Sequence, residues 1–364
     1  MKTERDSRFE LLRILACVMI VFNHYASHGV LLINQDNEYL LWKQGSFLNR
    51  LFVMLLTPGG RVGVAVFFML TGYHLINSDK TRKMLGIIIH TYYYAVICSI
   101  IALLCFFCGN PGNYSTYGIC MSLLKYLIVP ITSSGWWFVT VYLLLLLLMP
   151  QINAFIRRIS KRQFLFLLLY VCIFAYGIGG MIGTPFNLLF RGCFFYLLGG
   201  YISKHYVSNK QSFQVIRVLG FVVSWTSCAL VSFVTASNPS ALHINKKVLA
   251  VFFSLTENLL CIPICAVLLF TIALNAKIKR NHTINKIAGY SFGIYLFHDS
   301  GLTRNIIWNI AKVEKQYHSD LCVLWAGLTC LVIIAIASLF ELGYKTIHIR
   351  RKTNQCASAD KLKE

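Results

Sequence analysis

The stretch WWFVTVYLLLLLLMPQI, residues 136–152, contains no charged residue. Its length approaches the roughly 20 residues with which a helix crosses the hydrocarbon core of a bilayer. A membrane-spanning β-strand would alternate apolar and polar side chains, whereas the run from Tyr142 to Met149 does not alternate. Because lipid offers no hydrogen-bond partner, the backbone of such a segment must pair with itself, as it does in an α-helix. The stretch therefore predicts a transmembrane helix.

Similar apolar runs recur along the whole chain of 364 residues. Charged residues make up 13% of the chain, against roughly 25% in soluble domains, so too few are present to cover a water-facing surface. We predict an all-α integral membrane protein, a polytopic bundle of about ten transmembrane helices. The expected spans are residues 10–30, 59–77, 84–108, 136–152, 163–181, 186–204, 215–236, 247–275, 287–311 and 319–343. One transmembrane domain is expected over residues 6–345, followed by a basic cytoplasmic tail over 346–364.

Lysines and arginines produce a formal net charge of +21 and cluster in alternate connections between the expected spans. Such clusters mark the cytoplasmic side of a membrane protein, so both termini are predicted to be cytoplasmic. The same explanation leaves no reason to infer a nucleic-acid partner, because no solvated basic domain is visible. The 13 cysteines are scattered, and the Cys105-x-x-Cys108 pair has no second pair or nearby histidine to complete a zinc site. No metal site is predicted.

Ionisable side chains inside the first expected span are the strongest functional signal. Charged groups at membrane depth cost free energy, so each one is a hypothesis about function. Arg13 and His24 are eleven positions apart, which places both on one face of a helix and roughly 16 Å apart along its axis. Glu10 and His28 fall near the same face. An alternative interpretation is a structural polar stripe that is buried against other helices.

The ninth expected span, 287–311, supplies a partner for this face. His298 lies about as far above the cytoplasmic boundary of its span as His24 lies above its own, so the two imidazoles are expected at comparable depth. Asp299 follows directly and can orient an imidazole, as carboxylates beside histidines often do. Two histidines at one depth are able to share a site.

These residues belong to four motifs that resemble a known family. The motifs are RILACVMIVFNH (residues 13–24), RVGVAVFFMLTGY (61–73), WWF (136–138) followed by Tyr142 and Pro150, and SFGIYLFH (291–298). In this order they resemble the acyltransferase 3 family over nearly the whole chain. The resemblance implies a multi-pass enzyme of the bacterial cell (inner or plasma) membrane, in the compact form without a fused extracytoplasmic domain. It also implies O-acylation of surface carbohydrates.

The resemblance assigns chemical roles to the intramembrane residues. Acetyl-CoA is the expected acyl donor, as a substrate and not a bound cofactor, and the expected acceptor is a surface glycan or a lipid-linked sugar. Transfer to a hydroxyl needs a base, for which an imidazole is suited at neutral pH. We expect His24 to be this base, acting either directly on the acceptor or on a transient acyl carrier. His298 is expected to assist it by orienting or stabilising, with Asp299 in support. Arg13, supported by Glu10, is expected to hold the phosphates of the donor.

Arg61 is expected to bind donor or acceptor. Trp136 and Trp137 allow two interpretations: an aromatic belt at the outer membrane interface, or a stacking platform for the acceptor sugar. The main alternative function is a transporter or flippase for a glycan intermediate, with Arg13, His24 and His298 as its relay. Transporters often contain paired repeats and broken helices in matching positions, and the sequence shows no such symmetry. A structural or partner-binding membrane protein is a third possibility.

Overall fold

The computed structural model describes residues 5–31, 33–34, 37–38, 40–78, 84–109, 112, 114–132, 136–178, 184–206, 213–237 and 261–361. The regular structure in these ranges is helical apart from one antiparallel pair of short strands, β1 (Ile33–Asn34) and β2 (Asn37–Glu38). Six of the described helices are long and apolar enough to cross a membrane: Ser7–Val30, Phe47–Leu75, Met84–Phe107, Trp137–Ile156, Gln214–Val234 and Cys322–Ile347. The predicted all-α membrane protein is therefore confirmed, while the count of ten spans and the cytoplasmic termini stay predictions.

Helices and short helical turns follow one another along the described ranges of the chain. In chain order they are α1 (Ser7–His24), the π-helical turn η1 (Tyr25–Val30), α2 (Leu40–Gln44), α3 (Phe47–Leu56), α4 (Pro58–Leu75), α5 (Met84–Phe107), α6 (Thr116–Ile128), the 3-10 turn η2 (Pro130–Thr132), α7 (Trp137–Ile156), α8 (Lys161–Ile173), the π-helical turn η4 (Phe174–Ile178), α10 (Thr184–His205), α11 (Gln214–Ala236), α13 (Ile262–Leu274), α14 (His282–Ala288), α15 (Ser291–His298), α16 (Arg304–Ile310), α17 (Val313–Tyr317) and α18 (Cys322–Lys361).

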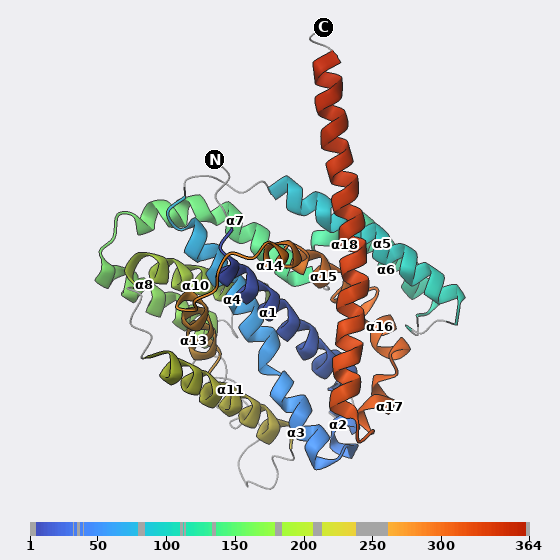
Figure 1. Ribbon diagram of the computed structural model, residues 1–364. Helices are drawn as coiled ribbons and strands as arrows, with labels where there is room; N and C mark the ends of the chain where they lie inside the picture. The colour runs from blue at the N-terminus through green and yellow to red at the C-terminus, as the bar shows by residue number, and fades with distance from the viewer. Residues whose placement is uncertain are drawn as a thin grey trace.

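Helix α1 occupies the centre of the bundle, where it packs against α4, α13, α14 and α15 (Figure 1). It begins at a capped end, because the Asp6 carboxylate accepts a hydrogen bond from the backbone N–H of Arg8 at 3.0 Å, as N-cap residues commonly do. The Arg8 guanidinium also lies 2.6 Å from this carboxylate. A central helix carries its polar side chains toward other helices, so Arg13 and His24 lie inside the protein.

Glycines allow α4 to approach its two neighbours closely. A Cβ atom on Gly63 would lie 2.7 Å from the carbonyl oxygen of Ala16 on α1. On the other side of α4, a Cβ on Gly199 of α10 would collide with the backbone of Met69. Transmembrane helices associate through such small residues, because lipid removes the hydrophobic drive between them. The backbone of α4 is therefore in close contact with the backbones of α1 and α10.

Helix α4 is the second half of a longer apolar helix that starts at Phe47. The predicted span 59–77 covered only this half. Pro58 stands at the first position of α4, where its missing N–H is tolerated. The side-chain amide of Asn23 donates to the carbonyl oxygen of Thr57 at 2.8 Å. This bond joins the α3–α4 junction to the residue that precedes His24.

The predicted continuous span over residues 287–311 is wrong. The structure divides it into α14, α15 and α16, with breaks at residues 289–290 and 299–303. In the second break the Thr303 hydroxyl donates to the carbonyl oxygen of Phe297 at 2.9 Å, so a side chain replaces the helical N–H partner. Asp299, Ser300 and Thr303 are buried there, and irregular backbone at membrane depth is tolerated where protein surrounds it. Hydropathy alone cannot detect such a break.

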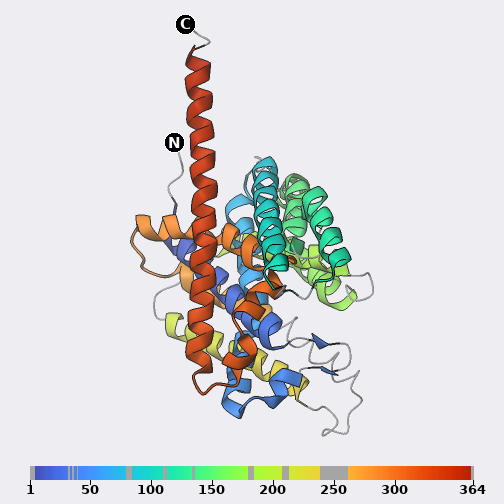
Figure 2. The ribbon, with the colours of Figure 1, turned by 90° about the vertical axis from the view of Figure 1, so that its right-hand side faces the viewer.

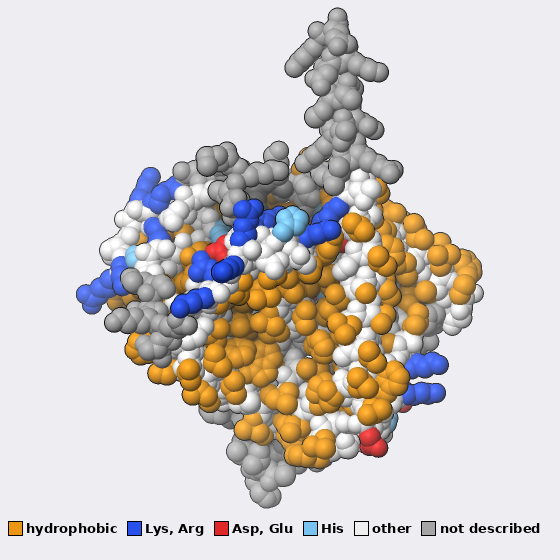
Figure 3. All heavy atoms as spheres, in the orientation of Figure 1, with side chains coloured by type: hydrophobic (Ala, Val, Ile, Leu, Met, Phe, Trp, Pro, Cys, Tyr) orange, Lys and Arg blue, Asp and Glu red, His pale blue; other side chains and the backbone are white. Residues whose placement is uncertain are grey.

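The start of α1 and the end of α18 lie on the same side of the bundle (Figures 1 and 2). In Figure 3 apolar side chains cover the middle of the visible face, and lysines and arginines gather along the rim on this side. On this side Arg5 donates a hydrogen bond to the carbonyl oxygen of Asn285 in α14. Lys345 donates one to the carbonyl oxygen of Gly289, which follows α14. Helix α18 continues to Lys361 without a break at the predicted boundary of 345/346. The predicted span 247–275 is described only from residue 261, and α13 forms most of that part.

Candidate active site

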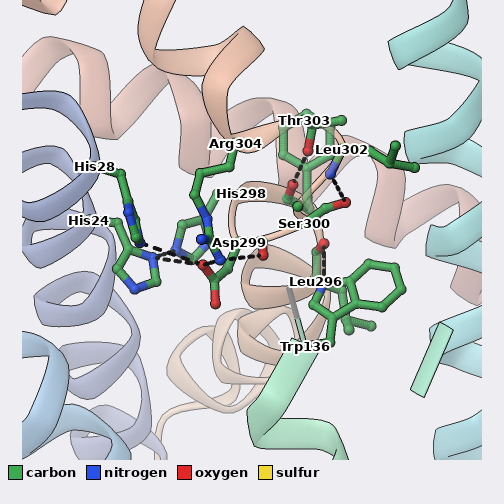
Figure 4. A network of polar contacts seen from close by, with 12 residues as sticks. His24, His28, Trp136, Leu296, His298, Asp299, Ser300, Leu302, Thr303 and Arg304 are labelled. Atoms are coloured by element: carbon green, nitrogen blue, oxygen red, sulfur yellow. Dashed lines mark hydrogen bonds and ion pairs between the residues drawn. The ribbon is translucent and has the colours of Figure 1, made fainter. Parts of the chain in front are cut away.

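Two histidines meet where α1 and α15 end. His24 is the last residue of α1 and His298 is the last residue of α15. The Nδ1 atom of His24 lies 3.0 Å from the Nε2 atom of His298, within hydrogen-bond distance (Figure 4). The structure thus brings together the two imidazoles that were expected at comparable depth. Their catalytic roles stay predictions.

The hydrogen bonds of His298 assign its tautomer and that of His24. The Nδ1 atom of His298 lies 2.6 Å from the carbonyl oxygen of Ile294. A carbonyl oxygen only accepts, so Nδ1 of His298 carries a proton and donates. In the neutral ring Nε2 then holds a lone pair and accepts from Nδ1–H of His24. The Nε2 atom of His24 is consequently left unprotonated, which is the state that a general base requires.

A buried carboxylate lies beside this pair. The Oδ1 atom of Asp299 is 3.6 Å from Nδ1 of His24 and 4.0 Å from Nε2 of His28. It also accepts from the Arg304 guanidinium at 2.6 Å (Figure 4). His24, His28 and Asp299 could group around a cation, but Arg304 already neutralises the only carboxylate among them. The cluster is therefore better suited to proton transfer than to metal binding.

A cavity of about 1060 Å³ connects these histidines to the first turns of α1. His24, His298 and Asp299 line one part of it, and Glu10 and Arg13 line another. The guanidinium of Arg13 lies 2.6 Å from the Glu10 carboxylate. Since α1 rises ~1.5 Å per residue, the cavity offers a cation roughly 16 Å from the His24 imidazole along the helix. Such a cavity can hold an extended, partly anionic molecule.

The two tryptophans behave differently. Trp136 is fully buried and does not line the cavity, and its indole N–H donates to the carbonyl oxygen of Leu296 on α15 at 3.1 Å. A stacking platform formed by Trp136 is therefore contradicted, because no ring face is accessible. Trp137 and its neighbour Phe138 do line the cavity. The platform hypothesis remains applicable to Trp137.

The structure brings further residues to this site, to which the sequence pattern assigned no specific role. The contact of Arg304 with Asp299 could not be predicted from the expected helix 287–311. In a continuous helix Arg304, five positions beyond Asp299, would lie on a different face. Helical spacing places His28 near the face of Arg13 and His24, and the structure brings its ring centroid to 4.8 Å from that of His24. Arg191 and Tyr176 line the cavity from α10 and η4. No local pattern in the sequence joins them to α1.

Comparison with known proteins identifies one family. A family model described as an acyltransferase domain matches residues 6–341, nearly the whole chain. Comparisons with curated proteins and with solved structures gave no match. The matched range includes all four sequence motifs, the histidine pair and, apart from Arg5, the residues that line the cavity. The chain therefore belongs to the acyltransferase 3 family, as its motifs predicted, and is a membrane acyltransferase.

Proposed function

We propose that the protein is a membrane-bound O-acyltransferase that transfers an acetyl group from acetyl-CoA to a hydroxyl of a surface polysaccharide or lipid-linked glycan. The observation that carries the proposal is the His24–His298 hydrogen bond in the wall of a cavity that Arg13 also lines. A hydroxyl acceptor requires a base, and the His24 imidazole has the tautomer that a base needs. A phosphate-bearing thioester requires a cation at a distance from that base, and Arg13 supplies one.

In the proposed reaction, Nε2 of His24 removes the proton of the acceptor hydroxyl as its oxygen attacks the thioester carbonyl. The new C–O bond forms a tetrahedral intermediate, which collapses as the C–S bond breaks. The protonated His24 then returns the proton to the departing thiolate, so CoA leaves as the free thiol. His298 accepts from Nδ1–H of His24 at 3.0 Å, and the Asp299 carboxylate at 3.6 Å favours the transient imidazolium.

Arg13 is the proposed contact for the donor phosphates. Its guanidinium lies 2.6 Å from the Glu10 carboxylate, which fixes the orientation of the planar guanidinium. The N–H groups that do not contact Glu10 suit a phosphate. An extended pantetheine arm can bridge the roughly 16 Å between Arg13 and the thioester position at His24. Basic residues near the start of α1 support a cytoplasmic position for this end. The acceptor then enters from the opposite side.

Purified full-length protein in lipid nanodiscs provides the test. With radiolabelled acetyl-CoA and a glycan extract, the wild type is expected to release free CoA and to label the glycan. His24→Ala should abolish both while it still binds acetyl-CoA. His282→Ala is a matched control, because this histidine is exposed and does not line the cavity. Normal glycan labelling by His24→Ala would overturn the mechanism. Wild-type protein that moves glycan without consuming acetyl-CoA would favour a transporter instead.

A further inference from the structure

The cavity contains a second positively charged region, formed by Arg61 of α4 and Arg191 of α10. Both line the cavity together with His24, and their guanidinium groups are close enough for their charges to interact. The guanidinium carbon of Arg191 lies 4.9 Å from the centre of the Tyr176 ring, a cation–π contact that holds the side chain in place. This region is separate from the Glu10–Arg13 pair.

Helix packing places the second region at the depth of His24. Gly60, which precedes Arg61, packs against the side chain of Asn23, which precedes His24. Arg61 is therefore roughly 16 Å from Arg13 along the α1 axis, by the rise per residue of a helix. A donor whose phosphates lie at Arg13 and whose thioester lies at His24 has no phosphate at this depth. The second region is thus available to the other substrate.

The carboxylates that line the cavity do not neutralise Arg191. They are already paired with other arginines: Asp6 with Arg8, Glu10 with Arg13, and Asp299 with Arg304, each at 2.6 Å. Arg191 itself donates from Nε to the carbonyl oxygen of Ala175 at 3.4 Å. Its two terminal nitrogens make no hydrogen bond or ion pair within the described ranges of the chain. A half-buried guanidinium with both terminal N–H groups free matches a phosphate or carboxylate.

We propose that Arg191, together with Arg61, binds an anionic group of the acceptor while the acceptor hydroxyl lies at His24. The anion is a phosphate or a carboxylate that belongs to the glycan or to its lipid carrier. This inference rests on the proposed function, because it assigns the acceptor to the part of the cavity that the donor leaves free. Charged groups at membrane depth are retained where they contact substrates. The subsite selects acidic or phosphate-linked glycans over neutral ones.

Three amphiphiles with the same decyl chain and the same hexose framework test the subsite: decyl glucoside, decyl glucuronide and a decyl glucosyl phosphodiester. Their binding is measured with radiolabelled probes and full-length protein in phosphatidylcholine nanodiscs. At least one anionic probe is expected to bind the wild type about tenfold or more tightly than the neutral one, as a charge-assisted hydrogen bond requires. Preference for the phosphodiester identifies a phosphate-linked carrier, and preference for the glucuronide identifies an acidic sugar.

Arg191→Gln is expected to remove this preference, and Arg191→Lys to retain part of it. Arg162→Gln is the matched control, because Arg162 is an exposed residue of α8 that does not line the cavity. Equal binding of all three probes by the wild type overturns the proposal, whether or not the variants fold. A preference that survives in folded Arg191→Gln also overturns it.

Acetyl-CoA binding, measured in the same nanodiscs, separates the two proposals. A wild type that selects the anionic probes but does not bind acetyl-CoA supports the subsite and refutes the acetyltransferase.

Discussion

The Nδ1 atom of His24 lies 3.0 Å from the Nε2 atom of His298, although 274 positions separate the two residues in the chain. Each imidazole stands at the C-terminal end of its helix. The carbonyl oxygen of Ile294 fixes the proton of His298 on Nδ1. A single backbone contact on α15 therefore determines which nitrogen of His24 carries the lone pair.

Removal of His298 should slow the chemical step more than it weakens donor binding. Without its Nε2 acceptor, the Nδ1–H group of His24 loses the partner that orients the ring, so base catalysis is impaired. We expect His298→Ala to lower kcat by no more than the about 10²–10⁴-fold that a general base contributes, because His298 acts through His24, with a smaller change in the Kd of acetyl-CoA. Steady-state kinetics and equilibrium binding measure the two effects. An unchanged kcat would exclude His298 from the mechanism.

Arg13 should affect the donor more than the acceptor. Arg13→Ala removes a guanidinium from the end of the cavity far from His24, and with it the charge-assisted hydrogen bonds proposed for the donor phosphates. The Kd of acetyl-CoA is expected to rise about tenfold or more, while acceptor selectivity is retained. Isothermal titration with acetyl-CoA checks the first effect and competition between two glycans checks the second. Unaltered acetyl-CoA affinity would contradict the role given to Arg13.

Loss of Arg304 should destabilise the protein. The Asp299 carboxylate is almost inaccessible, with 3% of its side chain exposed, and Arg304 is its counter-ion at 2.6 Å. Breaking a buried pair by removing one partner costs about 3–5 kcal/mol, so Arg304→Gln should lower the thermal unfolding midpoint in detergent. The double variant Asp299→Asn/Arg304→Gln removes both charges and is expected to recover much of this loss. A double variant less stable than Arg304→Gln would show that the pair is not the cause.

The close approach of α4 and α10 can be tested with glycine substitutions. A Cβ at Gly199 would meet the Met69 backbone, whereas a Cβ at Gly327 of α18 would have open space around it. We expect Gly199→Ala to cost about 1–3 kcal/mol through overpacking. Gly327→Ala should be neutral or stabilising by up to about 1 kcal/mol, because alanine is the better helix former. Unfolding midpoints of the purified variants compare the two sites, and equal midpoints would contradict the packing argument.

Trp136 and Trp137 are neighbours with different expected effects. Trp136→Ala should lower the free energy of unfolding by about 3–5 kcal/mol, because it empties a buried volume and leaves the Leu296 carbonyl without its donor. Trp137→Ala should change acceptor affinity with a smaller effect on stability, since this side chain lines the cavity. Thermal unfolding and glycan binding distinguish the two. Reversed effects would restore Trp136 as the platform.

Much of the fold could be predicted from composition and spacing because a bilayer limits the possible structures. An apolar segment without a hydrogen-bond partner in its solvent must form a helix, so stretches such as 84–108 and 186–204 closely match α5 and α10. Helical spacing also placed Arg13 and His24 on one face of α1, and both line the cavity. Family membership followed from short motifs whose order is visible in the chain.

Other features depended on tertiary contacts. The stretch 287–311 is apolar enough for one helix, yet buried side chains such as Thr303 supply the hydrogen bonds that allow it to break. That break turns Arg304 toward Asp299, and helix packing brings α15 against α1 so that His298 reaches His24. The burial of Trp136 likewise depends on neighbours far away in sequence. Hydropathy and spacing thus determined a membrane helix bundle with a polar central helix, because each depends on local backbone geometry and solvent. The pairing of charges and imidazoles was decided only by the packing of helices that the sequence does not place side by side.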